Sequence, residues 1–371
     1  MLAMHMANEL LTPAVAGGLI VVAAGVVAFA AWRTQRVFDP ARVPLMGVLG
    51  AFVFAAQMIN FPVLPGTSGH LGGGLLLALL LGPHPATLVM ASILIVQCLI
   101  FQDGGLLALG ANIINLGVLP CYLGYALFRV LAGRLAVGSV DVPRQPASVG
   151  VVRQPDQANT LAYASVPPPD RPAGTGRAYV AVFTAGIVAI TTGAALVPVQ
   201  SYLSGVVAVP LPQFLLAMIG LHLLIALVEV FITVTVIGYL GTVRPELVPA
   251  RLALTGVGGR MSLRAAVGSV LVVALLLGGV VSLFASEWPD ALESLTASET
   301  SAKTPLVVEN PDATVQKVSH WQERTALLPD YQWTSISGVI GTLLTLAVVW
   351  LIGRSLHGRR GSGVSTAPSA R

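Results

Sequence analysis

Long apolar stretches separated by short polar connections occupy most of this chain. A helix needs about 20 residues to cross a hydrocarbon core of ~30 Å, and most of the stretches approach that length. The pattern therefore predicts an all-α polytopic membrane protein. We expect nine transmembrane segments, at residues 13–32, 44–60, 71–82, 85–101, 105–129, 177–198, 212–240, 264–285 and 336–353. The third and fourth are separated only by residues 82–85, Gly-Pro-His-Pro, so this pair also fits a tilted hairpin or a re-entrant element shielded by other helices.

Two regions lack this apolar pattern. Residues 130–176 are rich in proline, alanine, valine and arginine, which predicts a disordered cytoplasmic linker. Residues 286–335 are polar and predict a small extracytoplasmic domain between two spans. We therefore expect a seven-span unit over residues 1–250, a two-span unit over residues 260–355 and a basic cytoplasmic tail over residues 356–371.

The composition supports a membrane location and the charges indicate an orientation. Only 10% of the residues are charged and 55% are hydrophobic, whereas soluble domains carry about 25% charged residues. Of the 20 basic residues, 17 fall in the connections 32–43, 129–177 and 241–264 and near the C-terminus, where they are Arg354, Arg359, Arg360 and Arg371. The positive-inside rule then predicts a plasma-membrane protein with its N-terminus outside and its C-terminus inside. The net charge of +4 thus reflects topology and indicates no nucleic acid partner.

The few cysteine and histidine residues narrow the candidate chemistry. Cys98 and Cys121 both lie within apolar runs, which excludes a disulfide framework and a cysteine-based zinc site. His70 ends an outer loop and precedes three glycines, Gly72 to Gly74, where the backbone can approach a bound ion closely. A histidine that only caps the following helix fits this position equally well.

His5 precedes the first span and is expected on the same outer side as His70. If translation starts at Met4, the α-amine of Met4 and the amide and imidazole nitrogens of His5 can form fused chelate rings. The imidazole of His70 then completes a square-planar set of four nitrogens, which suits Ni²⁺, Cu²⁺ or low-spin Co²⁺ better than Zn²⁺. A chain that retains Met1 cannot form this chelate.

Further polar residues lie within or beside the apolar segments. His222 and Glu229 are seven residues apart and share one helix face, about 10 Å apart. A carboxylate within a span is by default functional or paired, so this pair is either part of an ion pathway or a buried contact between helices. Candidates to orient the ligands or line a pathway are Asn60, Ser68, Gln97, Gln102, Asp103, Asn112 and Asn115.

An enzymatic alternative rests on Gly66-Thr67-Ser68-Gly69, which resembles the GxSG motif of rhomboid intramembrane proteases, with His222 as the base. Ser68 is expected in an outer loop rather than within a span, which disfavours this alternative. We therefore predict no catalytic residues.

Several of these stretches together resemble a transporter family. Met4-His5-Met6, residues 44–74 with Gly-Thr-Ser-Gly-His, residues 97–115 with Phe-Gln-Asp-Gly-Gly, and His222 with Glu229 are similar to the CbiM/NikM substrate-specific components of energy-coupling-factor (ECF) transporters. Residues 288–293, Trp-Pro-Asp-Ala-Leu-Glu, resemble the PDGLE module of CbiN/NikN, with alanine where that family has glycine.

The resemblance implies a membrane component that imports divalent cobalt or nickel as its substrate, without an organic cofactor. It implies Met4, His5 and His70 as metal ligands, and an S-component-like bundle for the seven-span unit. The implied partners are a coupling protein of the EcfT/CbiQ/NikQ type and an ATPase of the CbiO/NikO type. The chain has no Gly-Lys-Ser/Thr phosphate-binding motif of its own. A membrane metal sensor or a structural subunit without transport activity is the alternative.

Overall fold

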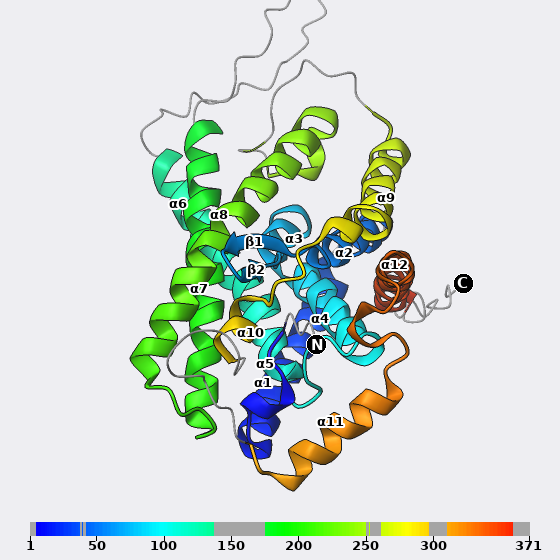
Figure 1. Ribbon diagram of the computed structural model, residues 1–371. Coiled ribbons are helices and arrows are strands. Elements are labelled where there is room, and N and C mark those ends of the chain that lie inside the picture. The colour runs from blue at the N-terminus through cyan, green and yellow to red at the C-terminus, as the bar shows by residue number, and fades with distance from the viewer. Residues whose placement is uncertain are drawn as a thin grey trace, which may run out of the picture.

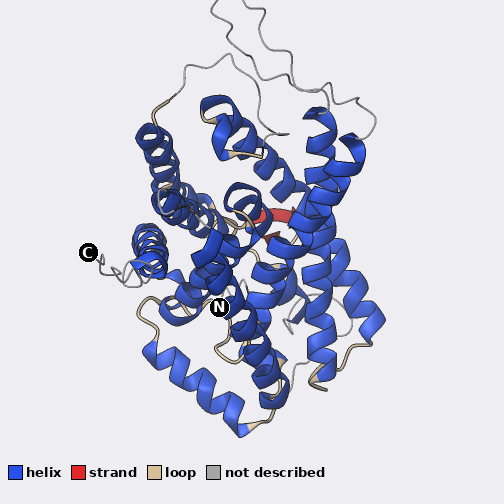
Figure 2. Cartoon of the chain, turned by 180° about the vertical axis from the view of Figure 1, so that it is seen from behind, coloured by secondary structure: helices blue, strands red, loops and turns tan. Residues whose placement is uncertain are grey.

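The protein is a bundle of helices with one small hairpin at its centre (Figures 1 and 2). A computed structural model of the chain describes residues 5–37, 39, 42–136, 175–249, 252, 261–296 and 310–358. The N-terminal part contains α1 (Pro13–Val37), α2 (Val43–Gln57), β1 (Phe61–Leu64), β2 (Thr67–Gly69), α3 (Gly74–Leu81), α4 (Pro83–Ile100), α5 (Leu109–Asn112), α6 (Tyr125–Ala136), α7 (Thr175–Leu203) and α8 (Leu211–Val243). The C-terminal part contains α9 (Leu263–Gly279), α10 (Ala291–Thr296), α11 (Ala313–Thr325) and α12 (Thr334–Gly358).

All nine predicted apolar segments are helical, although they differ in length. Seven helical stretches among the described residues are long and apolar enough to cross a membrane: Pro13–Arg36, Pro83–Ile100, Leu109–Gly133, Gly176–Leu203, Leu211–Val243, Leu263–Phe284 and Thr334–Leu356. This confirms the prediction of an all-α polytopic membrane protein.

The second and third predicted segments are shorter than expected and lie inside the bundle. Helix α2 has 15 residues, and α3 has eight, all buried. Eight helical residues span about 12 Å, so α3 does not cross a membrane by itself. Gly82, with φ of +85°, ends α3, and Pro83 starts α4 in the next position. The pair is therefore a short buried helix followed by a full-length one, which resolves the ambiguity of residues 71–101.

The helix between α5 and α6 contains two stretches of π-helix, at Ile113–Val118 and Pro120–Gly124. Wider π-helical turns are rare and occur frequently at functional sites. Asn115, Leu116 and Pro120 in these stretches face the central cavity described below. The local widening of this helix thus shapes the wall of that cavity.

Helices α9 and α12 of the C-terminal part pack on α2 and on each other. A Cβ atom added at Gly338 of α12 would collide with the carbonyl oxygen of Gly278 on α9, so the two backbones meet at this pair of glycines. Small residues allow such close approach in membranes, where packing replaces the hydrophobic effect between helices.

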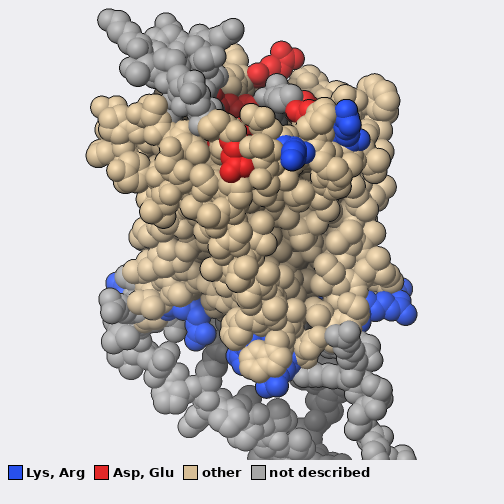
Figure 3. All heavy atoms as spheres, turned by 90° about the horizontal axis from the view of Figure 1, so that it is seen from below, with Lys and Arg blue, Asp and Glu red and all other residues tan. Residues whose placement is uncertain are grey.

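Predicted connections agree with the structure only in part. The predicted linker 130–176 falls mainly outside the described residues, and residues 130–136 instead belong to α6. Residues 359–371 of the predicted tail, and Met4, also fall outside them. Figure 3 shows Lys and Arg side chains around one end of the bundle, and acidic side chains with some further Lys and Arg near the opposite end, with a band of uncharged atoms between.

Candidate metal site beneath the hairpin

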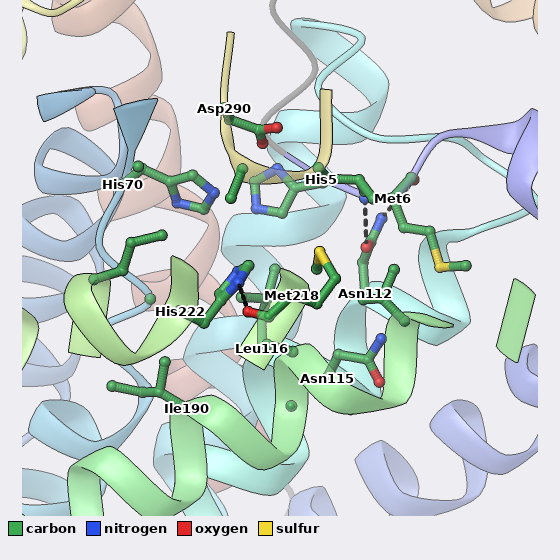
Figure 4. Close-up of a pocket in the computed structure, with 18 of the residues that line it drawn as sticks. His5, Met6, His70, Asn112, Asn115, Leu116, Ile190, Met218, His222 and Asp290 are labelled. Carbon is green, nitrogen blue, oxygen red and sulfur yellow. Dashed lines mark hydrogen bonds between the residues drawn. The ribbon is translucent and has the colours of Figure 1, made fainter. Parts of the chain in front are cut away.

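A cavity of about 70 Å³ lies in the bundle, close to the hairpin β1–β2. It is lined from the N-terminal segment by His5 and Met6, from the loop after β2 by His70, and from α8 by His222 and Glu229. Figure 4 shows the rings of His5 and His70 facing each other at one end of the cavity, with His222 nearby. The fold thus brings together three histidines from three separate parts of the sequence.

His5 is buried, with only 3% of its surface exposed. Its Nδ1 lies 2.8 Å from Oδ1 of Asp103, while its Nε2 is buried without a hydrogen-bond partner. Burial alone would raise the pKa of Asp103, but His5 and the Tyr331 hydroxyl lower it below its ordinary value. When the imidazole of His5 is neutral and Nδ1 donates to this carboxylate, Nε2 is the ring nitrogen that holds the lone pair.

The orientation of His5 differs from the chelate expected from the sequence. A fused ring through the amide nitrogen of His5 requires Nδ1, since Nε2 lies on the far side of the imidazole. Nδ1 is engaged by Asp103, so the ring as placed offers Nε2 as its ligand atom.

His70 lies beside His5, with 5.3 Å between the ring centroids and 50° between the ring planes. Its Nδ1 lies 3.1 Å from the carbonyl oxygen of Leu71. His222 is arranged similarly, with Nδ1 2.9 Å from the carbonyl oxygen of Met218. In each case Nδ1 donates to an oxygen, which leaves Nε2 as the nitrogen with a lone pair.

The glycines of Phe-Gln-Asp-Gly-Gly allow the N-terminal segment to pack beside Asp103. A Cβ at Gly104, which has φ of +85°, would lie 2.8 Å from Cβ of His5, and one at Gly105 would collide with the backbone nitrogen of Asn8. Asn112 then fixes the neighbouring Met6, accepting from its N–H at 3.0 Å and donating to its carbonyl at 3.1 Å. The motif therefore positions His5 through close backbone contact.

Glu229 holds the loop that carries His70. Its carboxylate accepts hydrogen bonds from the backbone N–H groups of Gly72, at 2.7 Å, and Gly73, at 2.8 Å. Gln57 donates to the carbonyl of Gly72 at 2.7 Å and accepts from Gln97 at 2.9 Å. The predicted residues Glu229 and Gln97 thus lie in one network that ends at this loop.

Ser68 contacts the C-terminal part. Its hydroxyl donates to the carbonyl of Trp288 at 2.7 Å, and its N–H donates to the carbonyl of Pro289 at 2.8 Å. This engagement does not support the nucleophile of the rhomboid alternative. Asn60 is buried beside the hairpin, and its carbonyl accepts from the N–H of Ser286.

The turn at residues 288–293 forms part of the cavity wall. Asp290 and Glu293 form a reciprocal capping box: Glu293 N–H donates to Oδ1 of Asp290, and Asp290 N–H to Oε2 of Glu293. Burial raises the pKa of Asp290 to about 7. Asp290, Ala291 and Leu292 line the cavity, a role that the sequence pattern alone did not indicate.

His84 and His320 do not line the cavity. His84, on α4, bonds Tyr122 at 2.8 Å, and His320, on α11, lies 3.6 Å from Glu323. Within the described ranges, no three His, Cys, Asp or Glu side chains are grouped closely enough to hold a metal ion. The described part of the candidate site contains the neighbouring imidazoles of His5 and His70, and Met4 lies outside the described residues.

Most of the chain matches the models of known protein families. Residues 5–153 and 157–247 match the family model CbiM, described as "Cobalt uptake substrate-specific transmembrane region". The chain belongs to the CbiM family. Residues 264–358 match the PDGLE domain, so this family member carries a second module, as the resemblance in its sequence predicted.

Some relatives align with nearly the whole chain, and others align with a part of it. A protein of Archaeoglobus fulgidus, described as a fused nickel transport protein NikMN, is 28% identical over 95% of this chain and 98% of its own length. The cobalt transport protein CbiM of Thermosediminibacter oceani is 37% identical over 27% of this chain and 40% of its own length. The crystal structure of a transition metal transporter is 26% identical, with a TM-score of 0.48, and the match covers 64% of this chain and 92% of that one.

Proposed function

We propose that this CbiM family protein captures divalent cobalt or nickel for import at an extracytoplasmic site formed by His5 and His70. The observation that carries the proposal is the pair of imidazoles 5.3 Å apart at a cavity, with Nε2 of His5 buried and unpartnered. A buried polar atom without a partner is costly unless a ligand satisfies it. Imidazole nitrogens are suitable ligands for both ions.

Met4 is part of the proposed site through its amine. In a chain that starts at Met4, a free α-amine directly precedes His5 and supplies one more nitrogen. A fused chelate would additionally require the His5 ring to turn about its Cβ–Cγ bond and release Asp103. Intact-mass measurement of the purified protein tests the start, with Met4 as the expected first residue.

The proposed orientation has the N-terminus outside and the C-terminus inside. The end of the bundle in Figure 3 where Lys and Arg gather without acidic side chains supports it, because that end is expected to face the cytoplasm. A fluorescent protein fused to the C-terminus should then fluoresce, as it folds only on the cytoplasmic side. A fusion that is exported and dark would contradict this orientation.

We further propose that a coupling protein of the EcfT/CbiQ/NikQ type and CbiO/NikO-type ATPases drive transport in the lipid bilayer. Membership of the CbiM family supports this assembly. In this scheme the ion passes inward from His5 and His70 along the cavity wall that contains His222, Asn112 and Glu229.

Metal uptake by variants tests the site. His5→Ala or His70→Ala should each abolish ATP-dependent accumulation of Ni²⁺ or Co²⁺ when the partner proteins are present, because each removes one facing imidazole. His320→Ala, at an exposed position on α11 that does not line the cavity, is the matched control and should transport normally. Unchanged accumulation in either cavity variant would contradict the proposed site, whereas metal binding without uptake would indicate the sensor alternative.

A further inference from the structure

Helix α11 of the PDGLE module is tied at both of its ends to the ends of membrane spans. Before the helix, the side-chain amide of Asn310 donates to the carbonyls of Glu9, at 3.1 Å, and Leu11, at 2.9 Å, which directly precede the span Pro13–Arg36. After the helix, the N–H of Leu328 donates at 2.9 Å to the carbonyl of Ile100, the last residue of the span Pro83–Ile100. Helix α11 therefore lies at the level where the spans end, at the edge of the bundle (Figure 1).

Large apolar side chains remain uncovered along this stretch. Trp321 on α11 is 52% exposed, Leu327 just after it is 74% exposed, and Trp333, next to the start of α12, is 71% exposed. Tryptophan is enriched where membrane spans meet water, because its ring is apolar and its N–H is polar. The exposed side chains thus lie at the level of the chain that is typical of a bilayer surface.

The side chains of α11 differ between its two flanks. Val315 and Gln322 are buried against the bundle. Each residue of a helix turns the chain by about 100°, so Trp321 and Glu323 lie on opposite flanks of Gln322. The flank of Glu323 is polar, and the carboxylate lies 3.6 Å from His320. One flank of the exposed surface is therefore aromatic, and the other carries charge.

Two basic residues adjoin the aromatic flank. Lys317 precedes Trp321 by four positions and Arg324 follows it by three, and residues at these spacings are neighbours on a helix surface. Both are exposed. Helices that lie in a bilayer surface combine tryptophan on one face with Lys and Arg on the polar face. The long stems of these basic side chains cover apolar surface while their charges reach the headgroups.

We propose that α11 is an interfacial helix, with the flank of Trp321 docked in the bilayer surface and with Lys317 and Arg324 bound to anionic lipid headgroups. The observations that carry the proposal are the anchoring of both helix ends at span ends and the separation of aromatic and acidic flanks. Docking requires only the membrane spans. The assignment to the outer leaflet rests on the proposed orientation.

Docking of α11 would also connect the membrane surface to the N-terminal segment. The hydroxyl of Ser319 donates to Oε1 of Glu9 at 2.8 Å, and Asn8 donates to Oε1 of Gln322 at 3.0 Å. Both α11 residues lie on or beside the buried face of the helix. The segment that contains His5 is thus held by a helix whose other surface contacts lipid.

A fluorophore attached at single cysteines tests which flank contacts lipid. The native residues Cys98 and Cys121 are buried, so a thiol reagent labels an introduced, exposed cysteine selectively. Thr325→Cys lies on the flank of Trp321, four positions along, and Glu323→Cys is the matched control on the opposite flank. The purified full-length variants, labelled with the fluorophore NBD, are reconstituted in vesicles whose lipids carry a nitroxide quencher near the headgroup.

Quenching should differ between the two labelled positions. We expect the Thr325→Cys label to be quenched about twofold more than the Glu323→Cys label, because an interfacial helix buries its apolar face about 5–10 Å into the headgroup boundary. Thr314→Cys and Gln316→Cys flank buried Val315 in the same way and repeat the comparison at the start of the helix.

The lipid charge tests the two basic residues. Quenching of the Thr325→Cys label should be stronger in vesicles that contain phosphatidylglycerol than in phosphatidylcholine alone, since anionic headgroups attract nearby Lys and Arg. Adding Lys317→Gln and Arg324→Gln should remove this difference. Arg264→Gln, at an exposed position at the start of α9, is the control and should preserve it.

Three outcomes would overturn the proposal. Equal quenching on both flanks would show that the flank of Trp321 does not face lipid. A Thr325→Cys label that is shielded only after other proteins are added would show that a protein covers this flank. Equal quenching in neutral and anionic vesicles would remove Lys317 and Arg324 as headgroup ligands. None of these outcomes depends on metal uptake, so the proposed metal site stands or fails separately.

Discussion

At the scale of single residues, glycines and buried polar side chains fix the positions of the two histidines. Gly104 and Gly105 allow backbone contact that any side chain would block, and Asp103 then meets the ring of His5. Asn8 extends this arrangement, donating to Gln322 of α11 at 3.0 Å. Close backbone contacts and buried hydrogen bonds thus hold the N-terminal segment that carries His5.

Glu229 offers a direct test at this scale. Glu229→Gln keeps the size of the side chain but replaces one acceptor oxygen by an NH₂ group, so one of the two N–H groups at Gly72 and Gly73 loses its partner. An unsatisfied buried donor costs about 1–3 kcal/mol. We expect lower thermal stability and weaker Ni²⁺ binding, because the loop of His70 loosens.

The control for this prediction is Glu246→Gln, on the exposed side chain that pairs with Arg244. Differential scanning fluorimetry and metal titration of both variants give the comparison. Equal stability of Glu229→Gln and the wild type would show that the carboxylate does not hold the loop.

At the scale of elements, close helix contacts determine how the PDGLE module joins the bundle. Helices α9 and α12 meet at Gly278 and Gly338 and both lie on α2, while α11 and the turn at residues 288–293 reach the N-terminal segment and the hairpin. The module therefore contacts both sides of the candidate site through separate elements.

The glycine contact makes a prediction about helix packing. In Gly338→Ala the new Cβ collides with the backbone of Gly278, so α9 and α12 must separate. Overpacking of this kind costs about 1–3 kcal/mol, and we expect a lower unfolding temperature in detergent. In Gly268→Ala on α9, nothing lies within 4 Å of the added Cβ, so this control should be neutral or slightly stabilising. Equal unfolding temperatures for the two variants would contradict the packing described.

At the scale of the whole molecule, the cavity is enclosed by segments from both ends of the chain. Metal bound there should stabilise the complete fold, since a ligand that binds only the folded state at 100 times its Kd adds about 2.7 kcal/mol. We expect Ni²⁺ to raise the unfolding temperature of the wild type but not of His5→Ala or His70→Ala. Mg²⁺, which prefers oxygen ligands, should have no effect. An equal rise with Mg²⁺ would point to non-specific binding.

The sequence by itself determined the membrane class, the helical segments, the two modules and the family. These depend on apolar length, on composition and on local motifs, all of which are properties of consecutive residues. It also singled out His5, His70, Asp103 and Glu229 as candidates. It did not distinguish the eight-residue α3 from a full span, because the apolar run continues past the point where Gly82 breaks the helix.

Only the tertiary structure decided which groups meet. The pairing of His5 with Asp103 joins residues 98 positions apart, and that of Tyr331 with Asp103 joins residues 228 apart, so no local pattern encodes either contact. The same holds for the carbonyls of residues 288 and 289 that accept from Ser68. Hydrogen-bond geometry depends on the relative placement of helices, and that placement arises from packing along the entire chain, such as the contact between Gly278 and Gly338. The nitrogen that His5 presents to the cavity is therefore a property of the folded bundle.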